Sequence, residues 1–169
     1  MPDGWLIHDF LHDARVGYTV LPHRPAYSAQ EEAAAIHVPG RDWAKVVVCI
    51  VDGEPVEAVV PAPAVVNLDR LLELTGGSRI RLAVEEELRR MYPDCELGAM
   101  PPFGPLYGQS VFVDVSLAAE PEIAFNAGTH TEAIRMRWRD FAAAVRPIVG
   151  RFADDPHEMA GYLRAIANT

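Results

Sequence analysis

The sequence predicts an α+β (mixed α/β) fold, a compact domain in which helices surround a mixed, largely antiparallel central sheet. Two apolar segments, Ala44–Val51 and Pro55–Val60, flank Asp52-Gly53, which is a strong hairpin signal. Helical and strand patterns follow one another without the regular alternation that is typical of parallel βαβ folds. The chain has 169 residues, 50% of them hydrophobic, so it is long enough to bury the core of such a domain.

The segments before this hairpin predict a helix, a strand and a second helix. Apolar residues four positions apart indicate a helix over Trp5–Ala14, and a short strand follows over Val16–Leu21. Ser28 and Glu31 match a capping box, in which two side chains bond the free N–H groups of the first helical turn. The second helix is therefore expected to begin after Ser28 and to run through Ile36.

The segments after the hairpin continue this irregular order. Asn67 caps a Leu-rich helix that stops at Gly76-Gly77, and a short strand covers Arg79–Leu82. Residues 85–90 predict a helix with an acidic first turn and a basic last turn, which complements the helix dipole. A Pro- and Gly-rich loop, the Gly98 loop, covers residues 93–108. Three further strands and a helix are expected at Val111–Val115, Glu122–Asn126, Glu132–Arg137 and Asp140–Val145.

These patterns predict one domain over residues 1–145 and a helical extension over residues 146–169. Asp155 and Pro156 match the cap and first position of a helix, and apolar side chains recur at helical spacing from Met159 to Ile166. We expect this helix to pack on its own domain rather than on a second copy. The expected assembly is a monomer or a weak homodimer.

Charge and composition argue against several classes of function. A net charge of −9 disfavours a protein that grips long nucleic acids by electrostatics alone, but it allows contact with one nucleic-acid end. The longest apolar run is too short to span a membrane, and the N-terminus lacks the basic region of a signal peptide. The two cysteines form neither a disulfide framework nor a zinc spacing. We expect a cytoplasmic protein without metal or cofactor.

Arginines on two strand patterns are local basic features. Arg135, Arg137 and Arg139 would share one face if their strand extends that far, and Arg79 and Arg81 share a face of another strand. Solvated strand faces explain both groups, and contact with phosphate is the alternative.

Three motifs suggest a single pocket. The turn Asn126-Ala127-Gly128-Thr129-His130 directly follows a strand, and it combines a glycine that permits close ligand approach with a histidine suited to proton transfer or recognition. Lys45 lies at the start of an apolar strand, where it needs an anion, a pocket or the solvated strand end. In the Gly98 loop, two consecutive prolines fix a backbone whose N–H groups could polarise a carbonyl oxygen.

Each motif also has a simpler interpretation. Asn and Thr can satisfy their own backbone in an ordinary turn, Lys45 can extend to solvent, and the prolines can stiffen a surface loop. His23, which lies between prolines, is a further candidate for the mouth of a pocket. The segment Gly108–Phe112 begins like a serine-hydrolase nucleophile elbow but has Phe in place of the final glycine. Any hydrolysis is therefore expected to proceed without a covalent enzyme intermediate.

The ordered motifs together resemble the YbaK/ProX-type aminoacyl-tRNA deacylase family, which includes the editing domain inserted in bacterial prolyl-tRNA synthetases. The resemblance runs from about Val16 to about Asp140. It rests on Tyr27-Ser28-Ala29-Gln30-Glu31-Glu32-Ala33, Val38-Pro39-Gly40, Ala44-Lys45-Val46-Val47-Val48, Glu85-Glu86-Glu87-Leu88, Gly98-Ala99-Met100-Pro101-Pro102-Phe103-Gly104, Val113-Asp114 and Phe125-Asn126-Ala127-Gly128-Thr129-His130. It implies a compact mixed-sheet domain that hydrolyses the ester of a mischarged aminoacyl-tRNA.

The resemblance also implies roles for individual residues. Lys45 is expected to hold the terminal adenosine or its phosphate, and Gly98 belongs to the loop that holds the aminoacyl carbonyl and the attacking water. Asn126, Gly128 and His130 match the second wall of the pocket, and Asn126 and His130 complete the expected catalytic set. The expected substrate-binding residues are His23, Ala99, Met100, Pro101, Pro102, Gly128 and Thr129.

The function that the resemblance implies is a freestanding trans-editing hydrolase for a tRNA that carries a small wrong amino acid, with alanyl-tRNA(Pro) as the first candidate. In this family, a hydroxyl of the substrate's own terminal ribose is thought to assist the attacking water, which agrees with the missing nucleophile. Ser28 stands where Thr is common, and Met100 can alter the pocket volume, so the amino acid preference stays open. The expected partners are the aminoacyl-tRNA acceptor end and, as a second candidate, an aminoacyl-tRNA synthetase, with no membrane contact.

Two alternative functions stay open. One is a catalytically inactive module that binds an aminoacyl or nucleotide-like group as a sensor or partner subunit. The negative net charge of the chain and the predicted C-terminal helix favour this alternative. The other is a hydrolase of small aminoacyl esters that does not depend on tRNA.

Overall fold

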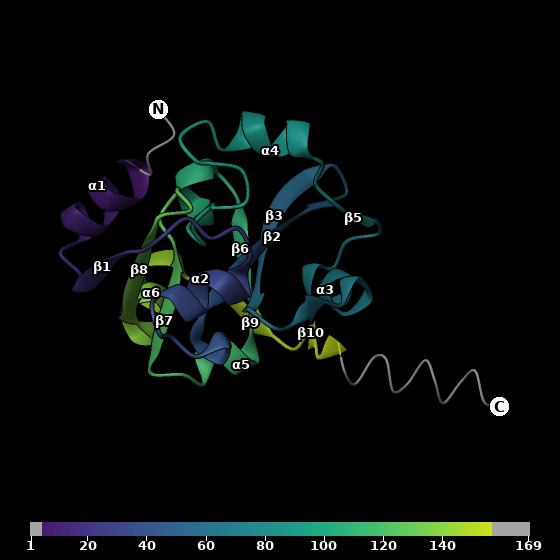
Figure 1. The fold of residues 1–169 in the computed structure, drawn as a ribbon. Coiled ribbons are helices and arrows are strands. Elements are labelled where there is room, and N and C mark those ends of the chain that lie inside the picture. The colour runs from purple at the N-terminus through teal and green to yellow at the C-terminus, as the bar shows by residue number, and fades with distance from the viewer. Residues whose placement is uncertain (1–4, 157–169) are drawn as a thin grey trace.

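The computed structural model describes residues 5–156, in which helices surround packed β-sheets (Figure 1). The helices and 3-10 turns are α1 (Trp5–Ala14), α2 (Ala29–Ala35), η1 (Gly40–Asp42), α3 (Leu68–Thr75), α4 (Glu85–Met91), η2 (Gly104–Tyr107), α5 (Val115–Ala118) and α6 (Trp138–Val145). The strands are β1 (Tyr18–Pro22), β2 (Ala44–Val51), β3 (Glu54–Pro61), β4 (Val65–Val66), β5 (Ile80–Leu82), β6 (Ser110–Asp114), β7 (Glu122–Asn126), β8 (Glu132–Arg137), β9 (Ile148–Gly150) and β10 (Ala153–Asp154). The apolar stripe expected at Met159 to Ile166 lies outside the described residues.

The strands form a mixed central sheet and two smaller antiparallel sheets. The five-stranded sheet has the order β5-β2-β3-β6-β9, in which β5, β2 and β3 are antiparallel while β6 runs parallel to both β3 and β9. The three-stranded sheet has the order β1-β8-β7, and β10 pairs with β4. A parallel bridge between Trp43 and Ala124 connects the two larger sheets. The predicted mixed α/β fold is confirmed.

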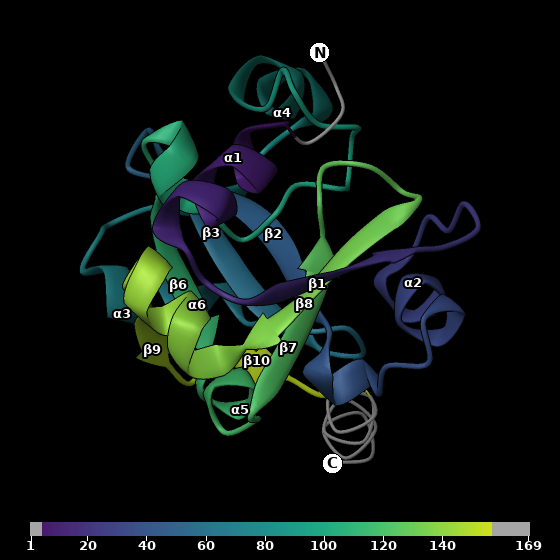
Figure 2. The same cartoon turned by 90° about the vertical axis from the view of Figure 1, so that its left-hand side faces the viewer.

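The main core lies between these two larger sheets. Figure 2 shows the three-stranded sheet crossing in front of β2 and β3. Val59 and Val113 from the central sheet belong to the same fully buried cluster as Phe125 and Ile134 from the three-stranded sheet. Phe103 from the Gly98 loop joins them, with its ring centroid 5.4 Å from that of Phe125. The Gly98 loop is therefore anchored in the core and not only at the surface.

The predicted hairpin is confirmed. Asp52 and Gly53 have φ angles of 49° and 86°, and such positive values at both central residues give the tight turn whose twist matches paired strands. Val51 consequently pairs with Glu54 in the register of β2 and β3.

The predicted caps of α2 and α3 are confirmed as well. The Oγ of Ser28 accepts the N–H of Glu31 at 3.1 Å, and the Oδ1 of Asn67 accepts the N–H of Arg70 at 3.1 Å. Each cap satisfies one of the N–H groups that a helix leaves free in its first turn. The cap at Ser28 also fixes where α2 begins, beside the site described below.

The prediction of a helical extension from residue 146 is wrong for residues 148–154. This segment forms β9, which pairs with β6, and β10, which pairs with β4. The strands are three and two residues long, too short to show the alternation by which a strand is recognised in a sequence.

Within residues 5–156, no helix is long and apolar enough to cross a membrane.

Two predicted strand ends differ from the structure. Asp114 ends β6 and accepts the N–H of Ser116 at 3.0 Å, so Val115 begins helix α5 instead of ending a strand. β8 ends at Arg137 and α6 begins at Trp138. Arg139 therefore lies on a helix, and the possible three-arginine stripe on one strand does not form.

Gly104 allows the Gly98 loop to return tightly to β6. A Cβ atom at Gly104 would lie 2.5 Å from the carbonyl oxygen of Gln109 and 2.6 Å from a Val111 methyl group. We expect Gly104→Ala to lower the free energy of unfolding by about 1–3 kcal/mol, the usual cost of overpacking a core. Gly17→Ala is the matched control, because a Cβ atom at Gly17 would meet nothing within 4 Å. Equal urea-denaturation curves for the two variants would contradict this account.

Candidate functional site

The three predicted motifs meet at one cavity. The cavity has a volume of about 430 Å³ and lies between the beginning of α2, the beginning of β2, the Gly98 loop and the end of β7. Sites for small molecules have volumes of roughly 300–1,000 Å³, so this one can hold part of a nucleotide or an aminoacyl group. Its lining residues are Tyr27, Ser28, Ala29, Gln30, Glu32, Trp43, Lys45, Val46, Ala62, Gly98 and Asn126.

Lys45 places a positive charge at the cavity. Its ammonium donates to the carbonyl oxygens of Ala62 at 3.1 Å and Ala64 at 2.6 Å. An ammonium has three N–H donors, so these two contacts hold the group in place and leave one donor for a ligand. Burial lowers the pKa of Lys45, since desolvation disfavours the charged form. An anion in the cavity would oppose that effect and would be held by a pre-positioned charge.

The Gly98 loop and the turn after β7 are bonded to each other through their backbones. The N–H of Gly128 donates to the carbonyl of Ala99 at 3.0 Å, and the N–H of Glu96 donates to the carbonyl of Gly128 at 2.8 Å. Gly98 has a φ of 86°, a conformation that favours glycine, and a Cβ there would lie 3.5 Å from the His130 ring. The two predicted walls are therefore one connected structure.

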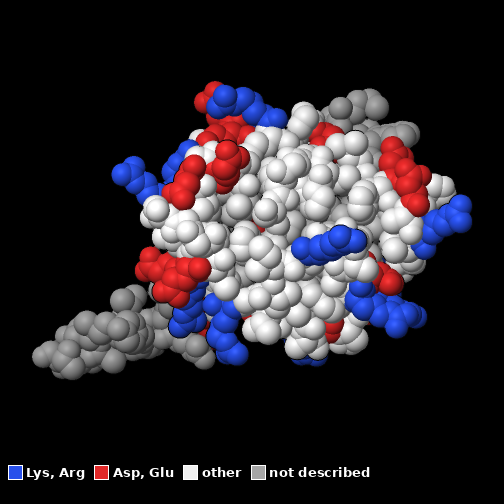
Figure 3. All heavy atoms as spheres, turned by 180° about the vertical axis from the view of Figure 1, so that it is seen from behind, with Lys and Arg blue, Asp and Glu red and all other residues white. Residues whose placement is uncertain are grey.

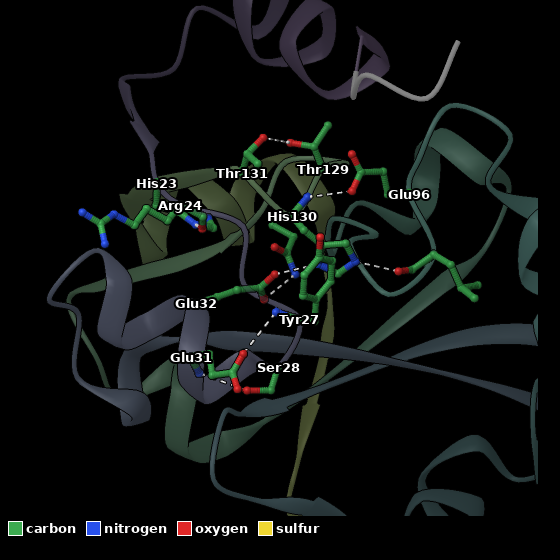
Figure 4. Close-up of polar contacts among 12 residues, drawn as sticks. His23, Arg24, Tyr27, Ser28, Glu31, Glu32, Glu96, Thr129, His130 and Thr131 are labelled. Carbon is green, nitrogen blue, oxygen red and sulfur yellow. Dashed lines mark hydrogen bonds and ion pairs between the residues drawn. The ribbon is translucent and has the colours of Figure 1, made fainter.

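His130 lies between a carboxylate and a carbonyl group. Its Nδ1 is 2.9 Å from Oε1 of Glu32 and its Nε2 is 2.7 Å from the carbonyl oxygen of Leu97. The backbone N–H of His130 donates to Glu96 at 3.1 Å, and the ring of Tyr27 lies 5.0 Å away, centroid to centroid. Figure 4 shows Glu32 reaching the His130 ring from α2. Both ring nitrogens are thus occupied.

The Glu32–His130 pair holds a proton more firmly than either group would alone. Burial lowers the pKa of His130, but the hydrogen bonds to Leu97 and Glu32 outweigh it and raise that pKa above its ordinary value. Burial raises the pKa of Glu32, against the opposing hydrogen bonds from His130 and Asn126. Both shifts favour keeping the proton, and the contacts of both His130 ring nitrogens leave neither of them to accept a proton from an attacking water.

Asn126 joins the same group. Its Nδ2 donates to Oε2 of Glu32 at 3.0 Å, and its Oδ1 is buried without a hydrogen-bond partner among the described residues. Of the residues expected to be catalytic, Lys45, Gly98 and Asn126 line the cavity, and His130 lies directly behind Gly98.

The residues expected to bind substrate lie outside the cavity lining. Ala99, Met100, Pro101 and Pro102 are buried, and Met100 packs with Val48 and Tyr92 in a separate apolar cluster. Because its side chain is part of the core, Met100 can affect the cavity only indirectly.

His23, Gly128 and Thr129 also lie apart from the lining residues. His23 Nδ1 is bonded to the Arg24 carbonyl at 2.7 Å, and the Thr129 hydroxyl lies 3.4 Å from that of Thr131 (Figure 4). Gly128, with a φ of 98°, contributes through its backbone bonds to the Gly98 loop. These positions support the walls instead of forming the surface of the cavity.

Glu32 is a residue of the candidate site that the sequence analysis did not single out. It follows Gln30 and Glu31 in the first turn of α2, where acidic residues are common because they complement the helix dipole. Its burial, with 2% of the residue exposed, becomes visible only in the structure. An unpaired glutamate at such a position is rare.

A second buried network holds both ends of the Gly98 loop. The Tyr92 hydroxyl, just before the loop, lies 2.8 Å from Glu57 on β3 and 2.8 Å from Gln109, just after the loop. A hydroxyl has one proton and can donate to only one of these acceptors. The second contact is satisfied when Glu57 is protonated, and burial indeed raises the pKa of Glu57 to about 8.

The charges outside the cavity do not form a continuous basic surface on the face opposite to that of Figure 1. Figure 3 shows Lys and Arg side chains around its rim, interspersed with Asp and Glu, and few charges in the middle. Arg135 pairs with Glu122 at 3.4 Å, and Arg81 pairs with Glu87 at 2.8 Å. Within residues 5–156, no group of three His, Cys, Asp or Glu residues is arranged to hold a metal ion.

Comparison with known proteins gives a family match and structural matches. The aminoacyl-tRNA editing domain family matches residues 23–144. The structure of "a putative trans-editing enzyme for prolyl tRNA synthetase" superposes with a TM-score of 0.80 at 21% identity, over 91% of this chain and 98% of that one. The hypothetical protein APE2540 superposes with a TM-score of 0.80 at 18% identity, over 88% of this chain and 99% of that one. Among curated proteins, no sequence matches this chain.

Proposed function

Since the chain belongs to the aminoacyl-tRNA editing domain family, we propose that it acts in trans, as a protein separate from a synthetase, and removes a small wrong amino acid from tRNA. Its enzyme class is aminoacyl-tRNA deacylase, an ester hydrolase. The first candidate substrate is alanyl-tRNA(Pro), which fits the likeness to a protein described as trans-editing for prolyl-tRNA synthetase. The observation that carries the proposal is the cavity that joins Lys45, Gly98 and Asn126.

The cavity favours attack by water over attack by a protein nucleophile. Ser28 has the one aliphatic hydroxyl among its lining residues, and its oxygen accepts the N–H of Glu31 as a helix cap. The ring nitrogens of His130 both face acceptors, so His130 is not available to deprotonate that hydroxyl. We infer that water attacks the ester with help from the vicinal hydroxyl of the substrate's terminal ribose.

The proposed roles follow from what each residue presents to the cavity. Lys45 has one N–H left for the phosphate or ribose of the terminal adenosine. The backbone of the Gly98 loop approaches the cavity at Gly98, where no side chain blocks the aminoacyl carbonyl. Asn126 lines the cavity with its amide held by Glu32. A second pocket of this kind is useful because a synthetic site rejects a smaller amino acid only weakly.

The test is a deacylation panel. Purified protein is mixed with tRNAs that carry correct and incorrect amino acids, alanyl-tRNA(Pro) among them, and with a short aminoacyl-adenosine mimic, and the released amino acid is measured. We expect release of small amino acids from full tRNA and slower release from the mimic. Binding without turnover would support an inactive module, and equal rates on both substrates would support a hydrolase that does not depend on tRNA. Either outcome contradicts the proposal.

A further inference from the structure

Glu32 connects the second wall of the cavity, at the end of β7 and in the turn that follows it, to helix α2. The residue is 2% exposed, and its two carboxyl oxygens contact different partners. Oε2 accepts from Asn126 at 3.0 Å, and Oε1 lies 2.9 Å from Nδ1 of His130. These partners come from the end of β7 and from the turn that follows it. One buried carboxyl group therefore fixes two side chains of the site.

The carboxylate determines the orientation of the Asn126 amide. A carboxylate oxygen only accepts hydrogen bonds, so Nδ2 of Asn126 must face Glu32 and Oδ1 must face away. Oδ1 has no hydrogen-bond partner among the described residues, and Asn126 lines the cavity. The buried amide oxygen is thereby left without a donor among the described residues.

The carboxylate also determines the charge of His130. While Glu32 is ionised, each ring nitrogen faces an acceptor, Glu32 Oε1 or the Leu97 carbonyl, and both bonds then form only when both nitrogens carry protons. The other charged group that faces His130 is Glu96, which accepts from its backbone N–H and favours the same charge. The bond to Leu97 then holds the residue next to Gly98.

We propose that Glu32 is the positioning residue of this site, which fixes the Asn126 amide and keeps His130 as a cation that binds the Leu97 carbonyl. The consequence for catalysis rests on the proposed function, whereas the charge of His130 does not. His130 then connects the turn after β7 to the Gly98 loop, and Glu32 acts on the reaction through its effect on His130.

Glu32→Gln separates the charge from the geometry. A glutamine at this position can accept from Asn126 through its oxygen and donate to Nδ1 of His130 through its nitrogen. That arrangement keeps all contacts, but it requires a neutral His130 that is protonated on Nε2 alone. Glu86→Gln is the matched control, because the Glu86 side chain is 83% exposed on α4.

The direct experiment is NMR of the histidine ring nitrogens in full-length protein. In the wild type and in Glu86→Gln, we expect both nitrogens of His130 to be protonated at pH 7, with a titration midpoint above the ordinary value of 6.5. In Glu32→Gln, we expect a single Nε2–H form at pH 7 and a lower midpoint. A neutral His130 in the wild type, or an unchanged midpoint in Glu32→Gln, would overturn the proposal.

Deacylation kinetics supply the second readout. At pH 7, kcat/KM should fall about tenfold to a hundredfold in Glu32→Gln, as expected when a charged hydrogen bond is lost. The ratio of wild-type to variant rates should shrink below pH 6, where His130 regains its proton without Glu32. A ratio that does not change with pH would mean that Glu32 is merely structural. If the wild type releases no amino acid, the proposed function fails, but the NMR result still decides the charge of His130.

Discussion

Lys45→Met should lower kcat/KM for deacylation of alanyl-tRNA(Pro) by about tenfold to a hundredfold while the protein stays folded. The substitution removes the charge but keeps a side chain of similar length, so the half-buried stem still packs. Hydrogen bonds to charged groups contribute about 1.5–3 kcal/mol, and about 1.4 kcal/mol corresponds to a tenfold change in rate. The loss should appear mainly in KM, because Lys45 is proposed to hold the adenosine or its phosphate.

Two comparisons make this result specific. Arg89→Met removes a positive charge from the exposed helix α4, where Arg89 pairs with Glu85 at 3.7 Å. This variant should leave the rate unchanged. Lys45→Arg should not restore the rate, because a planar guanidinium cannot direct its donors as the ammonium does toward Ala62, Ala64 and a ligand. Wild-type activity in Lys45→Met would remove Lys45 from the site.

Lys45 also provides a spectroscopic probe of binding, since it is the sole lysine in the sequence. Protein labelled with isotope-enriched lysine therefore gives one side-chain ammonium signal. Titration with adenosine 5′-monophosphate should shift this signal if the third N–H meets a phosphate or ribose in the cavity. An unchanged signal at saturating nucleotide would contradict the proposed contact.

Glu57→Gln should stabilise the protein increasingly as the pH rises from about 5 to 8. The pKa of Glu57 is raised from 4.5 to about 8 in the folded protein. Between these values the unfolded chain loses the proton while the folded protein keeps it, so the wild type loses stability with rising pH. The slope for one such group is about 1.4 kcal/mol per pH unit. Glutamine removes this dependence and can still donate to Tyr92.

The measurement is urea denaturation of both proteins at several pH values, with Glu54→Gln as the control. Glu54 lies at the exposed end of the same strand, so its substitution should have a smaller effect on stability. The difference between Glu57→Gln and the wild type should be smallest near pH 5 and largest near pH 8. A constant difference would mean that Glu57 is ionised in the folded protein and that Tyr92 does not depend on its proton.

The parts of the fold that the sequence predicted well are those controlled by local chemistry. Asp52-Gly53 adopts a backbone that few other pairs accept, so the hairpin and its register follow from two residues. Ser28 and Asn67 cap helices through their own side chains. In contrast, β9 and β10 exist because β6 and β4 present free edges to them, which no local pattern reports.

The sequence indicated the candidate site at positions where a residue type is energetically unfavourable unless it has a role. Lys45 in an apolar strand and the Asn-x-Gly-x-His turn belong to this class, and the structure places them around one cavity. Glu32 escaped notice because an acidic residue in a first helical turn needs no explanation. Met100 was expected to contact substrate from a loop rich in Pro and Gly, but that loop is anchored in the core, where Met100 packs against Val48.

The most direct test of the central claim is a single-turnover measurement of alanine release from two forms of alanyl-tRNA(Pro). One form has the natural terminal ribose, and the other carries alanine on the 3′-oxygen of a terminal 2′-deoxyadenosine. Because the proposed attack is by water with help from the ribose hydroxyl, we expect release from the first form and almost none from the second. Equal release from both would show that the substrate hydroxyl is dispensable, and no release from either would contradict the editing function.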